Sequence, residues 1–353
     1  MKQNDYTVTL IKAIFFSFLL ILTSPIRAEL NVVTTIKPLH SLISKVMEGL
    51  GEPSLIIEGT TSPHSFTLKP SHAKLLEEAD LIFWVGEGME TFMEKPLMSI
   101  VKDAEVISFM EVNSINKLKF REENIFESHD DHDEEDHDEH DEHDEHDEHD
   151  EHDDHDDHDE EDHDEHDEHD EHDDHDDHDS HADHAHGEFD AHIWLDPMNA
   201  KEMIHEIAHE LSHLDPSNKD KYNKNAESTL LDIDELINNI DQSINKDAQF
   251  VVFHDAYQYF ENRFGITSSG ALTLNTDALP GARQILDIQN VIKEKGVKCI
   301  FSEPQFNPKI IETIAKDTGI KTGIFDPLGS KLDADKNQYF TLIKNLRDNL
   351  KGC

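Results

Sequence analysis

The five residues Phe250-Val251-Val252-Phe253-His254 form an apolar run that ends on a histidine. A segment with helical periodicity follows at 255–264, and a second apolar run covers 266–272. A continuous apolar run of this length is typical of a strand buried on both faces of a sheet. The order strand, helix, strand therefore predicts two parallel strands joined by a crossover helix, which is the unit of an α/β fold.

The same alternation continues on both sides of this unit. Further strands are expected at 30–35, 55–57, 79–85, 298–301 and 320–325, and further helices at 38–50, 71–78, 281–295 and 308–318. Short apolar runs that alternate with helical segments predict parallel sheets covered by helices on both faces.

A long helical segment separates the two alternating halves. Residues 198–246 have helical periodicity and no strand signal, and Pro216 divides them. Proline breaks a helix interior, so the second part is expected to be one long helix. We predict an N-terminal α/β lobe at 29–215, a rigid linking helix at 216–246 and a C-terminal α/β lobe at 247–353.

The first 28 residues have the pattern of an export signal. Lys2 and Lys12 precede the apolar run 13–22, and Ala28 is a plausible cleavage residue. The run is too short to span a bilayer. The sequence therefore predicts a signal peptide at 1–28 and a periplasmic protein with no stable membrane insertion, which we expect to be a monomer.

An unusual tract occupies 129–186. It contains 19 of the 27 histidines and 36 of the 79 acidic residues, and it has neither lysine nor arginine. Such a composition cannot build a core, so we expect a disordered loop within the N-terminal lobe that offers many weak sites for divalent metals. The formal net charge of −49 excludes a nucleic-acid-binding protein, because a polyanion repels phosphate.

The chain has two cysteines, Cys299 and Cys353. Two cysteines of an exported protein usually pair in an oxidising compartment. We predict a disulfide that joins the C-terminus to a buried strand.

Eight histidines lie outside the tract: His40, His64, His72, His192, His205, His209, His213 and His254. Three of them follow a strand or lie in a turn, namely His64, His192 and His254. Ligands of open α/β sheets bind at the carboxyl ends of strands, so these three are the candidates for a binding site.

Six segments then resemble the solute-binding subunits of zinc-uptake ABC transporters, the ZnuA-like members of the metal-binding cluster A-I family. The segments are TTIKP at 34–38, PHSF at 63–66 with KPS at 69–71, HIWLDP at 192–197, FHDAY at 253–257, SEPQF at 302–306 and FDPLG at 325–329. They occur in family order along the predicted mature chain. A loop rich in histidine and aspartate between the first two candidate histidines is also similar to these proteins.

The resemblance implies a zinc site and its residues. His64, His192 and His254 would bind Zn²⁺, Asp326 or water would take the fourth position, and Glu303 would support the site. Manganese-binding relatives carry a carboxylate where His254 stands. Three imidazoles suit zinc, whereas manganese prefers oxygen ligands.

The resemblance also implies the partners. The protein would capture Zn²⁺ as its transported ligand in a cleft between the lobes. It would then deliver the ion to a membrane permease that a cytoplasmic ATPase drives, without catalysing a reaction. An alternative is a periplasmic zinc buffer or chaperone that acts mainly through the tract.

A third hypothesis comes from His205-Glu206-Ile207-Ala208-His209, which fits the H-E-x-x-H pattern of zinc metalloproteases. Its extended form fails, because Ser212 and Asp215 stand where glycine and a third histidine are required. Met203, Ile204, Ile207, Ala208 and Leu211 form the expected buried stripe of this helix. The histidines of this helix are therefore expected on a solvated face.

Overall fold

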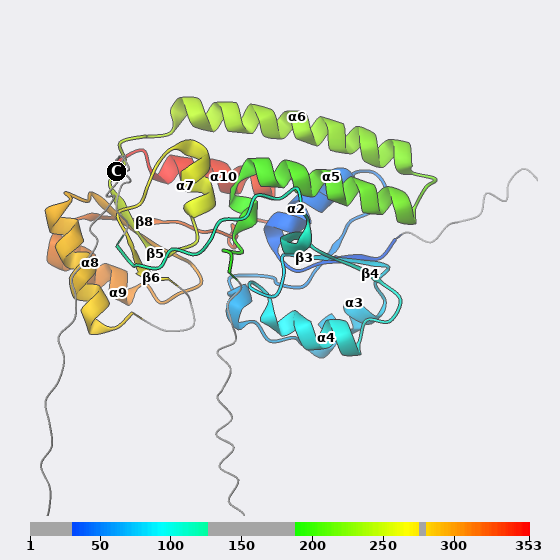
Figure 1. The fold of residues 1–353 in the computed structure, drawn as a ribbon, viewed down its shortest axis with the longest axis horizontal. Helices are drawn as coiled ribbons and strands as arrows, with labels where there is room; N and C mark the ends of the chain where they lie inside the picture. The colour runs from blue at the N-terminus through cyan, green and yellow to red at the C-terminus, as the bar shows by residue number, and fades with distance from the viewer. Residues whose placement is uncertain (1–29, 126–187, 275–279) are drawn as a thin grey trace, which may run out of the picture. The chain divides into compact units, whose positions relative to one another are not determined.

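The computed structural model describes residues 30–125, 188–274 and 280–353 (Figure 1). The predicted signal peptide and the histidine-rich tract lie outside these residues. Among the residues that are described, no helix combines the length and the apolar character that a membrane span requires.

Two four-stranded sheets form the framework. The first has the order β2-β1-β3-β4, with β1 at Val32–Thr34, β2 at Ser54–Leu55, β3 at Leu81–Trp84 and β4 at Glu105–Ser108. The second has the order β6-β5-β7-β8, with β5 at Phe250–His254, β6 at Ala271–Thr273, β7 at Cys299–Ser302 and β8 at Lys321–Ile324. Every neighbouring pair is parallel, so the predicted α/β fold with two parallel sheets is confirmed.

Nine α-helices connect and cover the sheets. They are α2 (Lys37–Val46), α3 (Pro70–Glu77), α4 (Glu94–Ser99), α5 (Pro197–Leu214), α6 (Lys219–Ser243), α7 (Gln258–Phe264), α8 (Ala282–Glu294), α9 (Lys309–Thr318) and α10 (Gln338–Asn349), counted over the described residues. Short 3-10 turns lie at Pro63–Ser65, Thr91–Met93, Phe109–Glu111 and Ile193–Leu195. The turns at 63–65 and 193–195 matter most for the site described below.

Helices α5 and α6 form the predicted helical segment. Asp196 caps α5 by accepting a hydrogen bond from the Met198 amide, and Pro197 occupies the first turn, where a missing N–H costs nothing. Helix α6 packs along α5 and also contacts α2 and α10 (Figure 1). The expected apolar stripe of α5 is buried, but Glu210 is buried with it.

The C-terminal helix α10 contacts segments from the first part of the chain. It packs against α2 and α6, and the Tyr339 amide donates a hydrogen bond to Ser41 Oγ at 3.0 Å. The Tyr339 hydroxyl donates to the Trp194 carbonyl at 2.9 Å. These bonds join the end of the chain to segments that precede α6.

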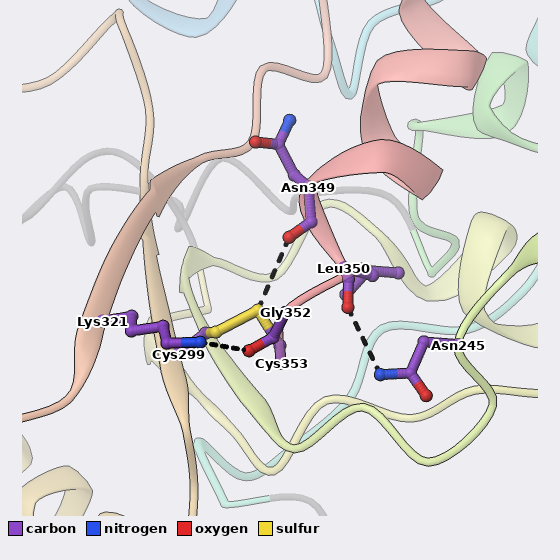
Figure 2. The surroundings of a disulfide bond; sticks show 7 residues. All are labelled: Asn245, Cys299, Lys321, Asn349, Leu350, Gly352 and Cys353. Atoms are coloured by element: carbon purple, nitrogen blue, oxygen red, sulfur yellow. Dashed lines mark hydrogen bonds between the residues drawn. A yellow bond between two sulfur atoms is a disulfide. The ribbon is translucent and has the colours of Figure 1, made fainter.

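The predicted disulfide between Cys299 and Cys353 is present (Figure 2). Cys299 begins β7, so the bond attaches the last residue to a buried strand. Lys321 Nζ donates to the Gly352 carbonyl at 2.9 Å, and Asn245 Nδ2 donates to the Leu350 carbonyl at 3.3 Å (Figure 2). The C-terminal residues are therefore held by hydrogen bonds as well as by the disulfide.

Strand β4 was not expected from the sequence, and β6 begins later than expected. Strand β4 has only Val106 and Ile107 as strongly apolar residues, and Val106 is 36% exposed at the edge of the sheet. In the predicted run 266–272, Gly270 forms an isolated bridge with Ile125, and β6 starts at the following residue. A strand at the edge of a sheet needs few apolar residues, so hydrophobic periodicity in the sequence does not predict it.

Candidate metal centre

Three segments that are far apart in sequence bring the candidate histidines together. His64 is the middle residue of the turn Pro63–Ser65, His192 is the residue before the turn Ile193–Leu195, and His254 is the last residue of β5. One nitrogen of each ring lies within 4.8 Å of the others. His192 and His254 are buried, whereas His64 is half-buried.

The spacing of the ring nitrogens suits a metal ion. The Nε2 atoms of His192 and His254 are 3.3 Å apart. Two nitrogens that each lie about 2.0–2.1 Å from a tetrahedrally coordinated zinc ion are about 3.3–3.4 Å apart. The His64 ring is next to both, with centroid distances of 5.6 Å to His192 and 6.3 Å to His254. The arrangement can therefore accept an ion with little movement of the two buried rings.

A carboxylate contacts the Nδ1 atom of each of the two buried rings and fixes its orientation. Asp190 Oδ1 lies 2.6 Å from His192 Nδ1, and Glu303 Oε1 lies 2.7 Å from His254 Nδ1. Both carboxylates are buried. When Nδ1–H donates to a carboxylate, the neutral ring keeps its lone pair on Nε2, and this lone pair is then available to a metal ion.

Glu303 and Asp190 also favour protonation of the His254 ring when no ion is bound. Burial opposes the charged form of His254, but the charge and hydrogen bond of Glu303, with the charges of Asp255 and Asp190, outweigh it and raise the pKa of His254. A proton and a metal ion therefore compete for this ring.

Apolar side chains surround the histidines. Besides the three rings and Glu303, the pocket has an apolar lining and two further polar residues: Pro63, Met89, Trp194, Phe306, Pro327 and Leu328, with Ser62 and Gln305. Trp194 Nε1 donates to the Pro327 carbonyl at 2.8 Å, which joins the segment after His192 to the segment after β8. Such walls limit solvent access and strengthen electrostatic interactions within the pocket.

The geometry gives no support to Asp326 as a ligand. Asp326 does not line the pocket, and it is not part of the histidine group. Its Oδ1 accepts from Gln305 Nε2 and the Leu328 amide, and its Oδ2 accepts from the amide and hydroxyl of Ser330. Asp326 thus holds the turn after β8, because its oxygens are already occupied.

Asp190 was missed from the sequence. It accepts from both the amide and the ring of His192 through Oδ1, and from Gln258 Nε2 through Oδ2 at 2.8 Å. An aspartate two residues before a candidate histidine was the available signal. Glu303, expected to support the site, contacts His254, and its Oε2 is buried without a hydrogen-bond partner.

The H-E-x-x-H pattern on α5 does not form a protease site. Among residues 30–125, 188–274 and 280–353, no group of candidate ligands contains both His205 and His209. The pattern nevertheless overlaps two mixed groups, Glu105–Glu210–His213 and Glu206–His209–Glu210. His205, His209 and His213 are exposed, as the sequence indicated, but Glu210 beside them is buried.

Comparison with known proteins places this geometry in context. Residues 32–353 match the family described as ZnuA, "Zinc-uptake complex component A periplasmic". The high-affinity zinc uptake system protein ZnuA of Brucella abortus (strain 2308) is 45% identical over 325 residues, which are 92% of this chain and 91% of that protein. The protein of the same name from Haemophilus influenzae is 39% identical over 336 residues, covering 94% and 95% of the two chains.

Solved structures share the fold. One described as the crystal structure of ZnuA has a TM-score of 0.65 at 19% identity, and the match covers 91% of this chain and 99% of that one. The laminin-binding protein of Streptococcus agalactiae, described as having adhesin and metal-transporting activity, has a TM-score of 0.64 at 23% identity with the same coverage.

Proposed function

Because the chain belongs to the family of zinc-uptake complex component A, we propose that it captures Zn²⁺ with His64, His192 and His254 and delivers the ion to an ABC import permease. The permease would be driven by a cytoplasmic ATPase. The protein would act in the periplasm after removal of a signal peptide at 1–28. It would bind and release its cargo without chemical change and would not act as an enzyme.

The observation that carries this proposal is the convergence of three imidazoles, two of which, His192 and His254, have their Nδ1 atoms held by buried carboxylates. The distance of 3.3 Å between the Nε2 atoms of His192 and His254 matches two ligands of one tetrahedral ion. Nitrogen-rich coordination favours zinc over manganese. We infer that water takes the fourth position, since Asp326 is occupied in its own turn.

Zinc-dependent growth tests whether the three-histidine site supports zinc delivery. Cells that lack this protein should grow in chelator-treated medium when they are given the wild-type chain, and should not grow when they are given the His254→Ala variant. His205→Ala is the matched control, since His205 is exposed on α5 and outside every candidate group. Growth supported equally by His254→Ala would show that the three-histidine site is not the delivery site.

The composition of residues 129–186 supports a second candidate, a zinc buffer that acts through the tract. A buffer needs capacity rather than one tight site. A chain without residues 128–187 would then fail to support growth even though it retains all three cleft histidines. Growth restored by this shortened chain would exclude the buffer as the main function.

A further inference from the structure

Helix α5 carries a second set of metal-binding side chains. The sequence Glu206-Ile207-Ala208-His209-Glu210-Leu211-Ser212-His213 repeats the pattern Glu-x-x-His. Residues three and four apart are neighbours on a helix surface, so the two glutamates and two histidines follow one side of α5. The sequence alone indicates a solvated face of this kind, and the structure adds two facts that change this interpretation.

The first fact is the position of Glu210. It is only 6% exposed, and its Oε1 lies 2.7 Å from His209 Nδ1. Glu105, at the start of β4, lies beside it, and Glu105 Oε2 is 3.8 Å from His213 Nδ1. One ligand atom from each of Glu105, Glu210 and His213 lies within 4.8 Å of the others. Two elements, a strand end and a helix, thus converge on one point.

The second fact is the charge at this point. Burial, and next the neighbouring charge of Glu210, raise the pKa of Glu105. Among the described residues, neither lysine nor arginine forms an ion pair with Glu105 or Glu210; their ion-pair partners there are His213 and His209. Two adjacent carboxylates, one of them buried, therefore lack a permanent positive partner within this part of the chain.

We propose that Glu105, Glu210 and His213 hold a second divalent transition-metal ion at the edge of the first sheet. One imidazole and two carboxylates suit zinc, and water would complete the coordination. His209 orients Glu210 through its hydrogen bond. This site has one nitrogen ligand where the cleft has three, and His213 is 70% exposed, so it binds more weakly than the cleft.

The proposal does not rest on the proposed function, because none of its ligands belongs to the cleft. It also differs from the protease hypothesis, which requires His205 and His209 as a pair. The ion would lie outside the pocket of His64, His192 and His254.

Carbethoxylation of histidines by diethyl pyrocarbonate tests the site in the full-length protein. Zinc is added in excess over all 27 histidines, so that the tract cannot withhold it. Tryptic cleavage after Lys201 and Lys219 gives one peptide, 202–219, that contains His205, His209 and His213 and no part of the tract. Tandem mass spectrometry then locates the label on each histidine.

The expected result is that zinc slows the labelling of His213 several-fold and leaves His205 unchanged. Glu105→Gln and Glu210→Gln should each abolish this protection, while Glu206→Gln should retain it. His254→Ala should also retain it, which separates this site from the cleft. Protection of His254, the one histidine of the tryptic peptide 247–263, shows that the glutamine variants remain folded.

Three results would overturn the proposal. His213 could react equally fast with and without zinc, or it could stay protected in Glu210→Gln, which would indicate shielding by another segment. Loss of protection in Glu206→Gln but not in Glu105→Gln would show that the ion binds to the Glu206–His209–Glu210 group instead.

Discussion

Replacing Asp190 by asparagine tests how strongly the zinc site depends on the carboxylate behind it. Asp190 accepts three hydrogen bonds, from the His192 amide, from His192 Nδ1 and from Gln258 Nε2. Asparagine has the same shape but only one acceptor oxygen, and its amide nitrogen needs an acceptor of its own. In either orientation of the amide, at least one donor therefore faces another donor.

The size of the effect follows from these contacts. If the asparagine oxygen stays on His192, the ring keeps its orientation but loses the negative charge that makes Nε2 a stronger ligand. If the amide turns over, the ring also loses its acceptor. Loss of such an outer partner typically costs 10- to 100-fold in metal affinity, or about 1.4–2.7 kcal/mol. We expect a loss within this range for Asp190→Asn.

Competition with a chromophoric chelator measures this loss in protein that lacks residues 128–187. Asp215→Asn is the matched control, because Asp215 is also a buried aspartate that accepts hydrogen bonds, here from Ser217 and Asn218 between α5 and α6. The control should lower thermal stability and leave zinc affinity unchanged. Equal zinc affinity in Asp190→Asn and wild type would refute the role assigned to Asp190.

Three further results are expected. His254→Glu should narrow the preference for zinc over manganese in competition dialysis, because it exchanges nitrogen for oxygen; an unchanged preference would remove His254 from the coordination shell. Zinc affinity should fall as the pH decreases through the raised pKa of His254. Calorimetry at pH 7 in buffers of different ionisation enthalpy should show that Glu303→Gln releases fewer protons per bound ion than wild type, because this change removes the group that raises the pKa. Equal proton release in the two proteins would contradict the pairing of Glu303 with His254. Cys353→Ser should lower the free energy of unfolding by about 4 kcal/mol in denaturant titrations, since the disulfide spans 54 residues, whereas a loss below about 1 kcal/mol would show that the hydrogen bonds of the C-terminus suffice.

Much of the fold was predictable because its central strands are buried on both faces. Strand β5 is a continuous apolar run, and the long helix α6 follows a proline. Strand β4 escaped prediction because it lies at an edge and begins with Glu105, so few of its residues need to be apolar. The contact of α10 with α2 is a tertiary arrangement that local periodicity does not encode.

The sequence indicated the three candidate histidines but not the hydrogen-bond partners of the residues at the site. His64, His192 and His254 stand in short turns or at a strand end, where the sequence indicates binding residues. The sequence could not show that Asp326 is occupied by its own turn, or that Asp190 is the partner of His192. Such assignments depend on distances between side chains, which chain order does not fix.

Zinc affinity of the chain without residues 128–187 tests the central claim most directly. The three histidines are held in short turns and at a strand end, and ligands that are already ordered lose less conformational entropy when they bind an ion. We predict that chelator competition finds one tightly bound zinc ion with the same dissociation constant as in the full-length protein, and that His64→Ala, His192→Ala or His254→Ala weakens this binding. Disappearance of tight binding on deletion of the tract alone would contradict the claim that these three histidines form the high-affinity site.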